Sequence, residues 1–104
     1  MMKYKVIIDY TAENDLVGIL HYIANTLHEP NVAKRIYKSI KEQILSLEEM
    51  PLRYPLINEE PYRTAGVRKI LVEGYTAFYL VNSADMTVHV FRILYSRREW
   101  QHLL

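Results

Sequence analysis

Paired arginines near the C-terminus are the most chemically suggestive feature of this sequence. Arg97 and Arg98 are adjacent, and Glu99 follows them. Two neighbouring guanidinium groups suit the recognition of phosphate or carboxylate, because each presents a rigid fork of N–H donors. The solvated start of a helix would explain the same two residues, so both interpretations stay open. Of the two, Arg98 is the one to which we would first assign a catalytic role.

Three other residues of the C-terminal half could contribute to such a site. Arg68 lies on an expected strand, where a structural ion pair is an equally good interpretation. Arg92 also lies on an expected strand, and it could simply end that strand at the surface. Tyr95 could donate a phenolic proton, although a core or rim aromatic is the simpler interpretation. We therefore treat Arg68, Tyr95 and Arg98 as candidate catalytic residues.

Thiol and metal chemistry are not indicated. The chain has no cysteine, which excludes a thiol nucleophile and a disulfide framework and suits a reducing compartment. His21 and His28 lie seven residues apart on one helical face, which is not a metal-binding spacing. We expect neither a metal nor a cofactor.

Length and composition indicate one globular domain over residues 1–104. Half of the residues are hydrophobic, which is enough to build one ordinary core. The net charge is only +1, so any nucleic-acid surface must come from local clustering. Lys34, Arg35, Lys38 and Lys41 could form such a cluster on one helix, although most stripes of this kind only face solvent.

The sequence contains no pattern typical of export or membrane insertion. Residues 1–5 lead directly into a short alternating segment, and no run approaches the ~20 apolar residues of a membrane span. We expect a cytoplasmic protein without a membrane partner.

The first half of the chain predicts a strand and two helices. Residues 3–9 favour a strand because β-branched side chains are concentrated there. Thr11 is the expected N-cap of a first helix, which Pro30 ends or turns. Asn31 is the expected cap of a second helix that runs to about Met50. Two helices joined by a short turn form a helical hairpin.

The second half predicts a loop and three strands. Residues 51–66 are rich in proline and form an ordered loop in our interpretation. Strands follow over residues 67–72, 75–81 and 86–95, the first two joined by a tight turn at Glu73-Gly74. Residues 96–104 could form a short terminal helix. The expected fold is α+β: an N-terminal strand, a helical hairpin and a three-stranded antiparallel meander, in one sheet with the helices on one face.

Several segments, in this order, resemble the RelE/ParE superfamily of bacterial toxins. They are Thr11 to Leu16, the close at Ser46, Leu47 and Pro51, the strand Val67 to Val72, the stretch Tyr75 to Tyr79, and Val90 to Trp100. Each fragment is weakly specific, but together they cover nearly the whole chain. The resemblance implies a toxin of a type II toxin–antitoxin module that a small cognate antitoxin neutralises.

The superfamily has two mechanisms, and the resemblance implies different residues for each. RelE-like members cleave mRNA at the ribosome without a metal, and ParE-like members inhibit DNA gyrase. Related nucleases carry an arginine after the Gly-Tyr of the central strand, and here Thr76 follows Gly74-Tyr75. A second family arginine lies in a basic-basic-Glu segment, matched by Arg97-Arg98-Glu99. Thr76 slightly favours the gyrase mechanism.

Three hypotheses therefore stand. The first is a ParE-like gyrase inhibitor, the second is a RelE-like endoribonuclease, and the third is a non-toxic relative that only binds a partner. Whether the chain is an enzyme depends on which is right. In all three, the residues we expect to bind a target or partner are Lys34, Lys38, Arg92, Arg97 and Trp100.

Overall fold

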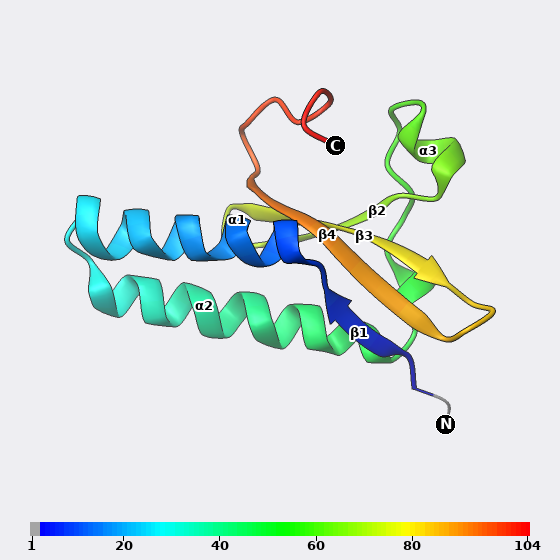
Figure 1. Ribbon diagram of the computed structural model, residues 1–104, viewed down its shortest axis with the longest axis horizontal. Coiled ribbons are helices and arrows are strands. Elements are labelled where there is room, and N and C mark those ends of the chain that lie inside the picture. The colour runs from blue at the N-terminus through cyan, green and yellow to red at the C-terminus, as the bar shows by residue number, and fades with distance from the viewer. Residues whose placement is uncertain (1–2) are drawn as a thin grey trace.

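The computed structural model describes residues 3–104, and its elements follow the predicted order (Figure 1). The strands are β1 (Lys5–Ile8), β2 (Arg68–Val72), β3 (Tyr75–Asn82) and β4 (Thr87–Tyr95). The longer helices are α1 (Tyr10–His21), which continues into the π-helical turn η1 (Tyr22–Thr26), and α2 (Pro30–Leu45). Short helical turns are η2 (Ser46–Glu48), η3 (Pro51–Arg53) and α3 (Tyr62–Ala65).

The strands form one sheet in the order β1-β4-β3-β2. β2, β3 and β4 are an antiparallel meander, whereas β1 pairs with β4 in parallel. The N-terminal strand therefore lies beside the last strand of the chain. The α1–α2 hairpin packs against one face of this sheet, so the predicted α+β fold is confirmed.

The predicted helix caps were wrong. The α1 helix begins at Tyr10 with Asp9 at the N-cap position, so Thr11 lies inside its first turn. The α2 helix begins at Pro30 itself, after Glu29, so Pro30 starts this helix and Asn31 does not cap it. Proline suits the first helical position because its fixed φ is helical and its missing N–H would have no partner there. Neither N-cap residue makes a side-chain capping hydrogen bond.

Two other boundaries also differ from the prediction. The regular helix α2 ends at Leu45, and Met50 adopts a left-handed backbone (φ 51°), so the helical region does not run unbroken to Met50. Residues 96–104 contain turns but no helix. The predicted turn at Glu73-Gly74 is confirmed, because both residues have positive φ (53° and 85°), as a two-residue hairpin turn requires.

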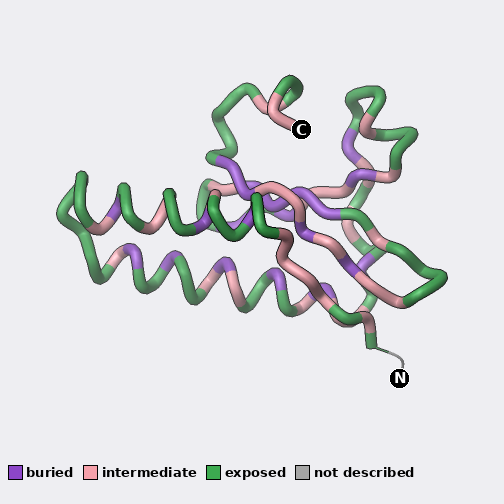
Figure 2. Tube along the Cα trace, viewed as in Figure 1, coloured by how far each residue is buried: buried purple, intermediate pink, exposed green. Residues whose placement is uncertain are grey.

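Buried residues are concentrated on the strands of the sheet and recur along α2 (Figure 2), and they form two clusters on opposite faces of the sheet. The larger cluster lies between the sheet and the helices and includes Ile40, Ile44, Ala77 and Tyr79. Tyr79 is fully buried there, and its hydroxyl donates a hydrogen bond to the Pro51 carbonyl (2.7 Å). A smaller cluster lies on the other face, where the loop before β2 and the C-terminal segment cover the sheet. Its buried members are Ile57, Val67, Phe78 and Leu94.

Within residues 3–104, none of the helices is both long and apolar enough to cross a bilayer.

Candidate functional site

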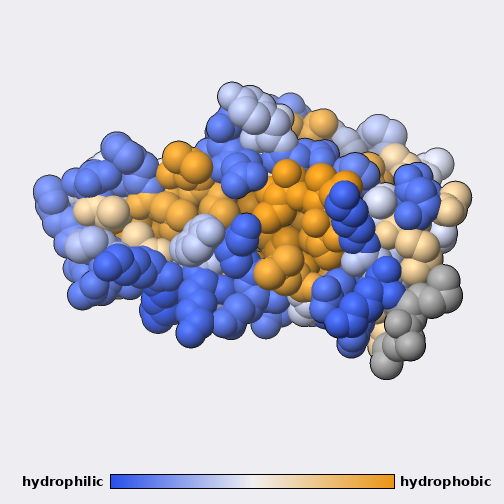
Figure 3. Space-filling view, turned by 60° about the horizontal axis from the view of Figure 1, so that its bottom comes forward, coloured by the Kyte–Doolittle hydropathy of each residue, from blue (hydrophilic) through white to orange (hydrophobic). Residues whose placement is uncertain are grey.

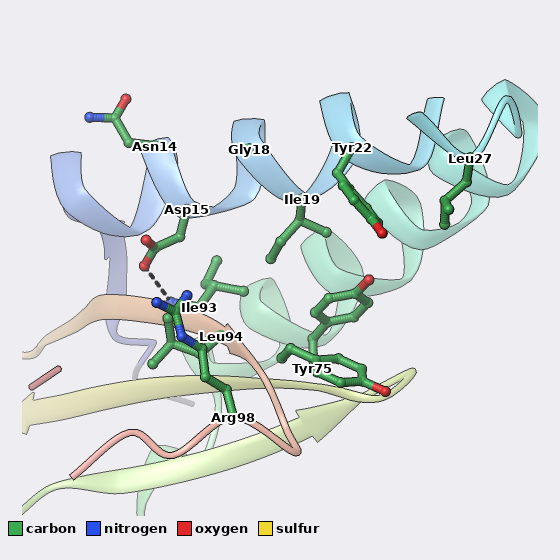
Figure 4. A pocket seen from close by; sticks show the side chains of 11 residues that line it. Asn14, Asp15, Gly18, Ile19, Tyr22, Leu27, Tyr75, Ile93, Leu94 and Arg98 are labelled. Atoms are coloured by element: carbon green, nitrogen blue, oxygen red, sulfur yellow. Dashed lines mark hydrogen bonds between the residues drawn. The ribbon is translucent and has the colours of Figure 1, made fainter. Parts of the chain in front are cut away.

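The main pocket, of about 710 Å³, opens between α1 with η1 on one side and the end of β4 on the other (Figure 4). Ile19 and Ile93 supply apolar side chains to it, and Gly18 lines it without any side chain. Tyr95 and Arg98, two of the three predicted catalytic residues, also line it. The structure therefore brings these two together.

Three tyrosines from three elements surround this pocket. Tyr22 comes from η1, Tyr75 from the start of β3 and Tyr95 from the end of β4. The rings of Tyr75 and Tyr95 meet edge to face, with centroids 5.9 Å apart. Burial raises the pKa of Tyr75, and Tyr95 and Tyr22 raise it further. At neutral pH the Tyr75 hydroxyl is thus a neutral hydrogen-bonding group and not a phenolate.

Arg98 brings a cation to the pocket. Its backbone N–H donates to the Tyr95 carbonyl (3.0 Å), which fixes the turn that follows β4. Its side chain extends from this turn toward the α1 side of the pocket (Figure 4). Among residues 3–104, no acidic side chain lies within ion-pair distance of Arg98. Arg97 is exposed beside it but does not line the pocket.

Arg92 is engaged inside the molecule. Its Nε and Nη2 donate to the two carboxylate oxygens of Asp15 (2.8 and 3.0 Å), and its Nη1 donates to the Leu103 carbonyl (2.7 Å). The hydrogen bond to Asp15 raises the pKa of Arg92, which therefore stays charged. The same carboxylate accepts the backbone N–H of Ile93 (3.0 Å). This arrangement connects α1, β4 and the C-terminal segment.

Arg68, the third predicted catalytic residue, lies apart from the pocket. Its Nη1 donates to the backbone carbonyls of Leu52 and Tyr54, in the loop that precedes β2. The contact is to carbonyls, so it is not the ion pair we had considered. This position suits an arginine that anchors the loop to the edge of the sheet.

Thr76 occupies the central-strand position where related nucleases carry an arginine. Its side chain points to the sheet face away from the helices, but it is only 5% exposed. Its hydroxyl shares a hydrogen bond with the Ser96 hydroxyl (2.9 Å). The segment after β4 therefore covers Thr76, and this position is not open to solvent.

Trp100 and the basic residues of α2 lie on other surfaces. The Trp100 ring packs against Phe78 and Tyr62, with centroids 5.0 and 5.8 Å apart. Lys34 and Lys38 are exposed on α2. Lys34 borders an apolar groove of about 530 Å³ between α1 and α2, which Val17, Leu20 and Tyr37 also line.

Sequence reasoning missed Asp15, Gly18, Tyr22 and Tyr75 as parts of the pocket. In the sequence, Asp15 is explained by the preference for acidic residues near the start of a helix. Gly18 was the clearest indication of a site in the sequence. A glycine inside a helix lowers helix stability by about 1 kcal/mol relative to alanine, so its presence there calls for a structural or functional explanation. Tyr22 and Tyr75 had no comparable signal, since only the folded chain brings η1 close to the start of β3.

The arrangement suits binding by charge, hydrogen bonds and aromatic contact. The pocket combines phenol hydroxyls, an unpaired guanidinium and apolar walls, which together accept an anionic group next to a flat or apolar one. Within residues 3–104, no three His, Cys, Asp or Glu side chains are grouped so as to hold a metal ion.

Three solved structures with the same fold come from toxin–antitoxin systems. A chain of the chromosomal ParDE system from P. aeruginosa superposes with a TM-score of 0.72 and 23% identity, over 91% of this chain and 98% of that one. A chain of the RelBE2 complex from Mycobacterium tuberculosis superposes with a TM-score of 0.65 and 21% identity, over 91% of this chain and 93% of that one. A chain of the archaeal RelE-RelB complex from Pyrococcus horikoshii superposes with a TM-score of 0.56 and 19% identity, over 94% of this chain and 100% of that one. Likeness at these identities shows the fold alone.

No curated protein sequence matches the chain. A family model does: the ParE toxin of the type II toxin–antitoxin system parDE matches residues 6–100, which is nearly the whole sequence. The match confirms the resemblance that the ordered segments indicated. The chain therefore belongs to the ParE toxin family of type II toxin–antitoxin systems, within the RelE/ParE superfamily.

Proposed function

We propose that this toxin inhibits DNA gyrase and does not act by cleaving mRNA. The observation that carries the proposal is Thr76, which is buried and hydrogen-bonded to Ser96 where related nucleases have an arginine. Cleavage without a metal needs cations against the scissile phosphate, because charge develops there in the transition state. The central strand supplies none here, and the donors of Arg68 and Arg92 are directed to internal acceptors.

The two mechanisms separate in a direct experiment. The purified protein is added to a gyrase supercoiling assay and, in parallel, to translating ribosomes with a defined mRNA. We expect loss of supercoiling and intact mRNA. Cleavage of A-site mRNA together with unaffected supercoiling would reject the proposal. Normal growth after induction, with neither effect, would indicate a non-toxic relative that only binds a partner.

A ribosome-dependent ribonuclease is the second candidate, and one observation favours it. Arg98 and Tyr95 line the same pocket, where a guanidinium could bind phosphate and a phenol could transfer a proton. On this mechanism Arg98→Ala lowers cleavage by roughly 10²–10³, the usual effect of removing one transition-state donor. Arg97→Ala is the matched control, since Arg97 is equally exposed but lies outside the pocket.

We further propose that a small cognate antitoxin binds this chain. The structural neighbours come from ParDE, RelBE2 and RelE-RelB systems, and the latter two are described as complexes. Here the groove between α1 and α2 is lined mainly by apolar side chains and bordered by the cation of Lys34, and an exposed apolar surface with a polar rim suits the docking of a partner. Figure 3 shows hydrophobic side chains gathered across the middle of one face, between hydrophilic borders.

An amphipathic helix with acidic flanks fits this groove, because Lys34 borders it and Lys38 lies one turn further along α2. Co-expression with each short neighbouring reading frame should give a stable complex and restore growth. Tyr37→Glu, which puts a charge in the groove, should weaken that complex. Leu52→Glu, at an exposed apolar position outside the groove, is the control. Failure of every neighbouring product to bind would reject the antitoxin proposal.

A further inference from the structure

The edge of β4 that faces α1 is only partly covered. β1 pairs with β4 from Thr87 to Val90, and the Asp9 N–H then makes the last hydrogen bond of this ladder, to the Val90 carbonyl. The chain leaves the sheet there to begin α1. β4 continues to Tyr95, so in the part of the chain that the structure describes its last residues have no neighbouring strand on this side.

The register shows which backbone groups point to this edge. The Ser96 N–H bonds the Gly74 carbonyl, and Thr76 is paired with Leu94, so Ile93 and Tyr95 direct their own backbone groups away from β3. Two of these groups are occupied. The Ile93 N–H donates to Asp15, and the Tyr95 carbonyl accepts the N–H of Arg98.

The Ile93 carbonyl and the Tyr95 N–H remain. Within residues 3–104, no side chain, turn or loop makes a hydrogen bond to either group. One residue of a parallel strand, placed opposite Leu94, would donate its N–H to the Ile93 carbonyl and accept the N–H of Tyr95. A residue of an antiparallel strand would need both the N–H and the carbonyl of Ile93, or both those of Tyr95. The Ile93 N–H and the Tyr95 carbonyl already have hydrogen-bond partners. The free Ile93 carbonyl and Tyr95 N–H therefore favour a strand that runs parallel to β4, as β1 does.

The pocket provides room for such a strand. It lies over Ile93, Leu94 and Tyr95, and α1 faces it with Gly18. A Cβ built on Gly18 meets no atom within 4 Å, so helix and incoming backbone can approach closely. Tyr22 projects into the same space from the helical side (Figure 4).

We propose that an extended segment of the cognate antitoxin adds to β4 here as a parallel strand, over Ile93 to Tyr95, in line with β1. The proposal rests on the proposed antitoxin partner and names where and how part of it binds. In the antitoxin strand, the two residues that flank the one opposite Leu94 direct their side chains to the helical face of the sheet, as Ile93 and Tyr95 do. Apolar or aromatic residues at these two antitoxin positions would fit against Ile19 and Tyr75. An acidic residue fits beside Arg98, because Asp15 is already neutralised by Arg92.

Hydrogen exchange on the complex tests the position directly. The full chain is co-purified with the neighbouring antitoxin, and the backbone amide of Tyr95 is followed with and without it. We expect exchange at Tyr95 to slow by about tenfold or more on binding, as for an amide that gains a ladder hydrogen bond. A stable complex in which the Tyr95 amide exchanges as fast as in the free chain would overturn the strand addition while leaving the antitoxin proposal intact. If no neighbouring product binds, both proposals fail.

Two pairs of variants test the same contact by affinity. Gly18→Leu fills the pocket with a good helix former, whereas Gly18→Ala adds only a methyl group and serves as control. Tyr95→Pro removes the free N–H without removing a ladder hydrogen bond, whereas Tyr95→Ala keeps that N–H. For Gly18→Leu and Tyr95→Pro we expect antitoxin affinity to fall by roughly tenfold or more relative to their controls, with unchanged melting temperatures. Equal affinity within each pair would overturn the proposal.

Discussion

Asp15 of α1 and Arg92 of β4 form a two-point ion pair that joins the helical hairpin to the last strand. The side chains are 15% and 20% exposed, so the pair is largely withdrawn from water. Asp15 also accepts the Ile93 N–H, and Arg92 also donates to the Leu103 carbonyl. Arg92 was expected from the sequence to bind a target or partner. Its donors are instead used within the chain, although that expectation itself stays a prediction.

Breaking this pair should be costly. We expect Asp15→Asn and Arg92→Gln each to lower the free energy of unfolding by about 2–3 kcal/mol, somewhat less than for a fully buried pair. The double variant should cost less than the two single changes added, because each single change leaves an uncompensated partner. Urea denaturation of the four proteins measures this difference. Strict additivity would show that the two residues act independently.

The exposed pair Arg35–Glu73 is the matched control. It joins α2 to the β2–β3 turn, and the Arg35 hydrogen bond, followed by that of Ser39, lowers the pKa of Glu73. Because both side chains reach solvent, Arg35→Gln should lower the free energy of unfolding much less than Arg92→Gln does. A cost equal to that of Arg92→Gln would mean that burial does not explain the difference.

Thr76→Arg distinguishes a degenerate nuclease site from a structural position. The arginine would enter a covered position on the face beneath the segment after β4, so we expect a loss of roughly 3 kcal/mol or more and a lower melting temperature. Thr76→Val, which removes only the hydroxyl bond to Ser96, should cost about 1 kcal/mol. Gain of mRNA cleavage by Thr76→Arg at an unchanged melting temperature would contradict this and support an ancestral nuclease site.

Tyr79 should make the fold sensitive to alkali. Burial raises its pKa from 10.0 to about 12, although Arg68 and Arg53 act in the opposite direction. The unfolded chain therefore loses this proton near pH 10 while the folded chain keeps it. The stability due to Tyr79 is complete below pH 10 and declines as the pH rises from 10 to 12.

Urea midpoints at pH 9, 10.5 and 11.5 measure this decline. Tyr79→Phe should be less stable at pH 9 by about 1 kcal/mol, because the hydroxyl bond to the Pro51 carbonyl is lost. The variant should also show a shallower decline above pH 10, since a phenylalanine side chain does not titrate. Parallel declines in the two proteins would assign the effect to other groups, such as Tyr75.

Trp100→Ala should release the C-terminal segment from the sheet. The indole packs between Phe78 and Tyr62, and the Tyr62 hydroxyl donates to the Gln101 carbonyl. We expect the free energy of unfolding to fall by about 2 kcal/mol, which is less than for a fully buried tryptophan. We also expect faster amide exchange over residues 96–104. Trp100→Phe should keep most of the packing. Unchanged exchange in Trp100→Ala would mean that other contacts, such as that of Arg92 with the Leu103 carbonyl, hold this segment.

The sequence predicts the strands and helices well because their signals are local. Alternation, helical spacing and the Glu73-Gly74 turn each depend on neighbouring residues, and the elements they predict are present. The caps failed because Thr11 and Asn31 are good capping residues in isolation, whereas the ends of α1 and α2 are set by where β1 leaves the sheet and by Pro30. The C-terminal segment lacks a helix because Trp100 and Leu103 pack on the sheet individually.

The site was harder to predict than the fold. Tyr95 and Arg98 were identified because their residue types carry chemistry, and both line the pocket. Their counterparts on α1 and η1 are more than 70 residues away in sequence, and nothing in the pattern pairs them. The covered position of Thr76 was equally hidden, since alternation along β3 does not reveal that both faces of the sheet are buried.

The parallel pairing of β1 with β4 also determines when, during synthesis, the sheet of this protein can close. Lys5 lies beside Thr87, and the Asp9 side chain is hydrogen-bonded to His89. The first strand therefore cannot pair with β4 until almost the whole chain has been synthesised. Contacts so distant in sequence close late and slow the folding of a chain. A nascent or truncated product that lacks β4 has no partner for β1 and no wall for the pocket beside α1. A closed sheet therefore requires a nearly complete chain, and the interval before the sheet closes is time in which a binding partner already present can meet the newly made protein.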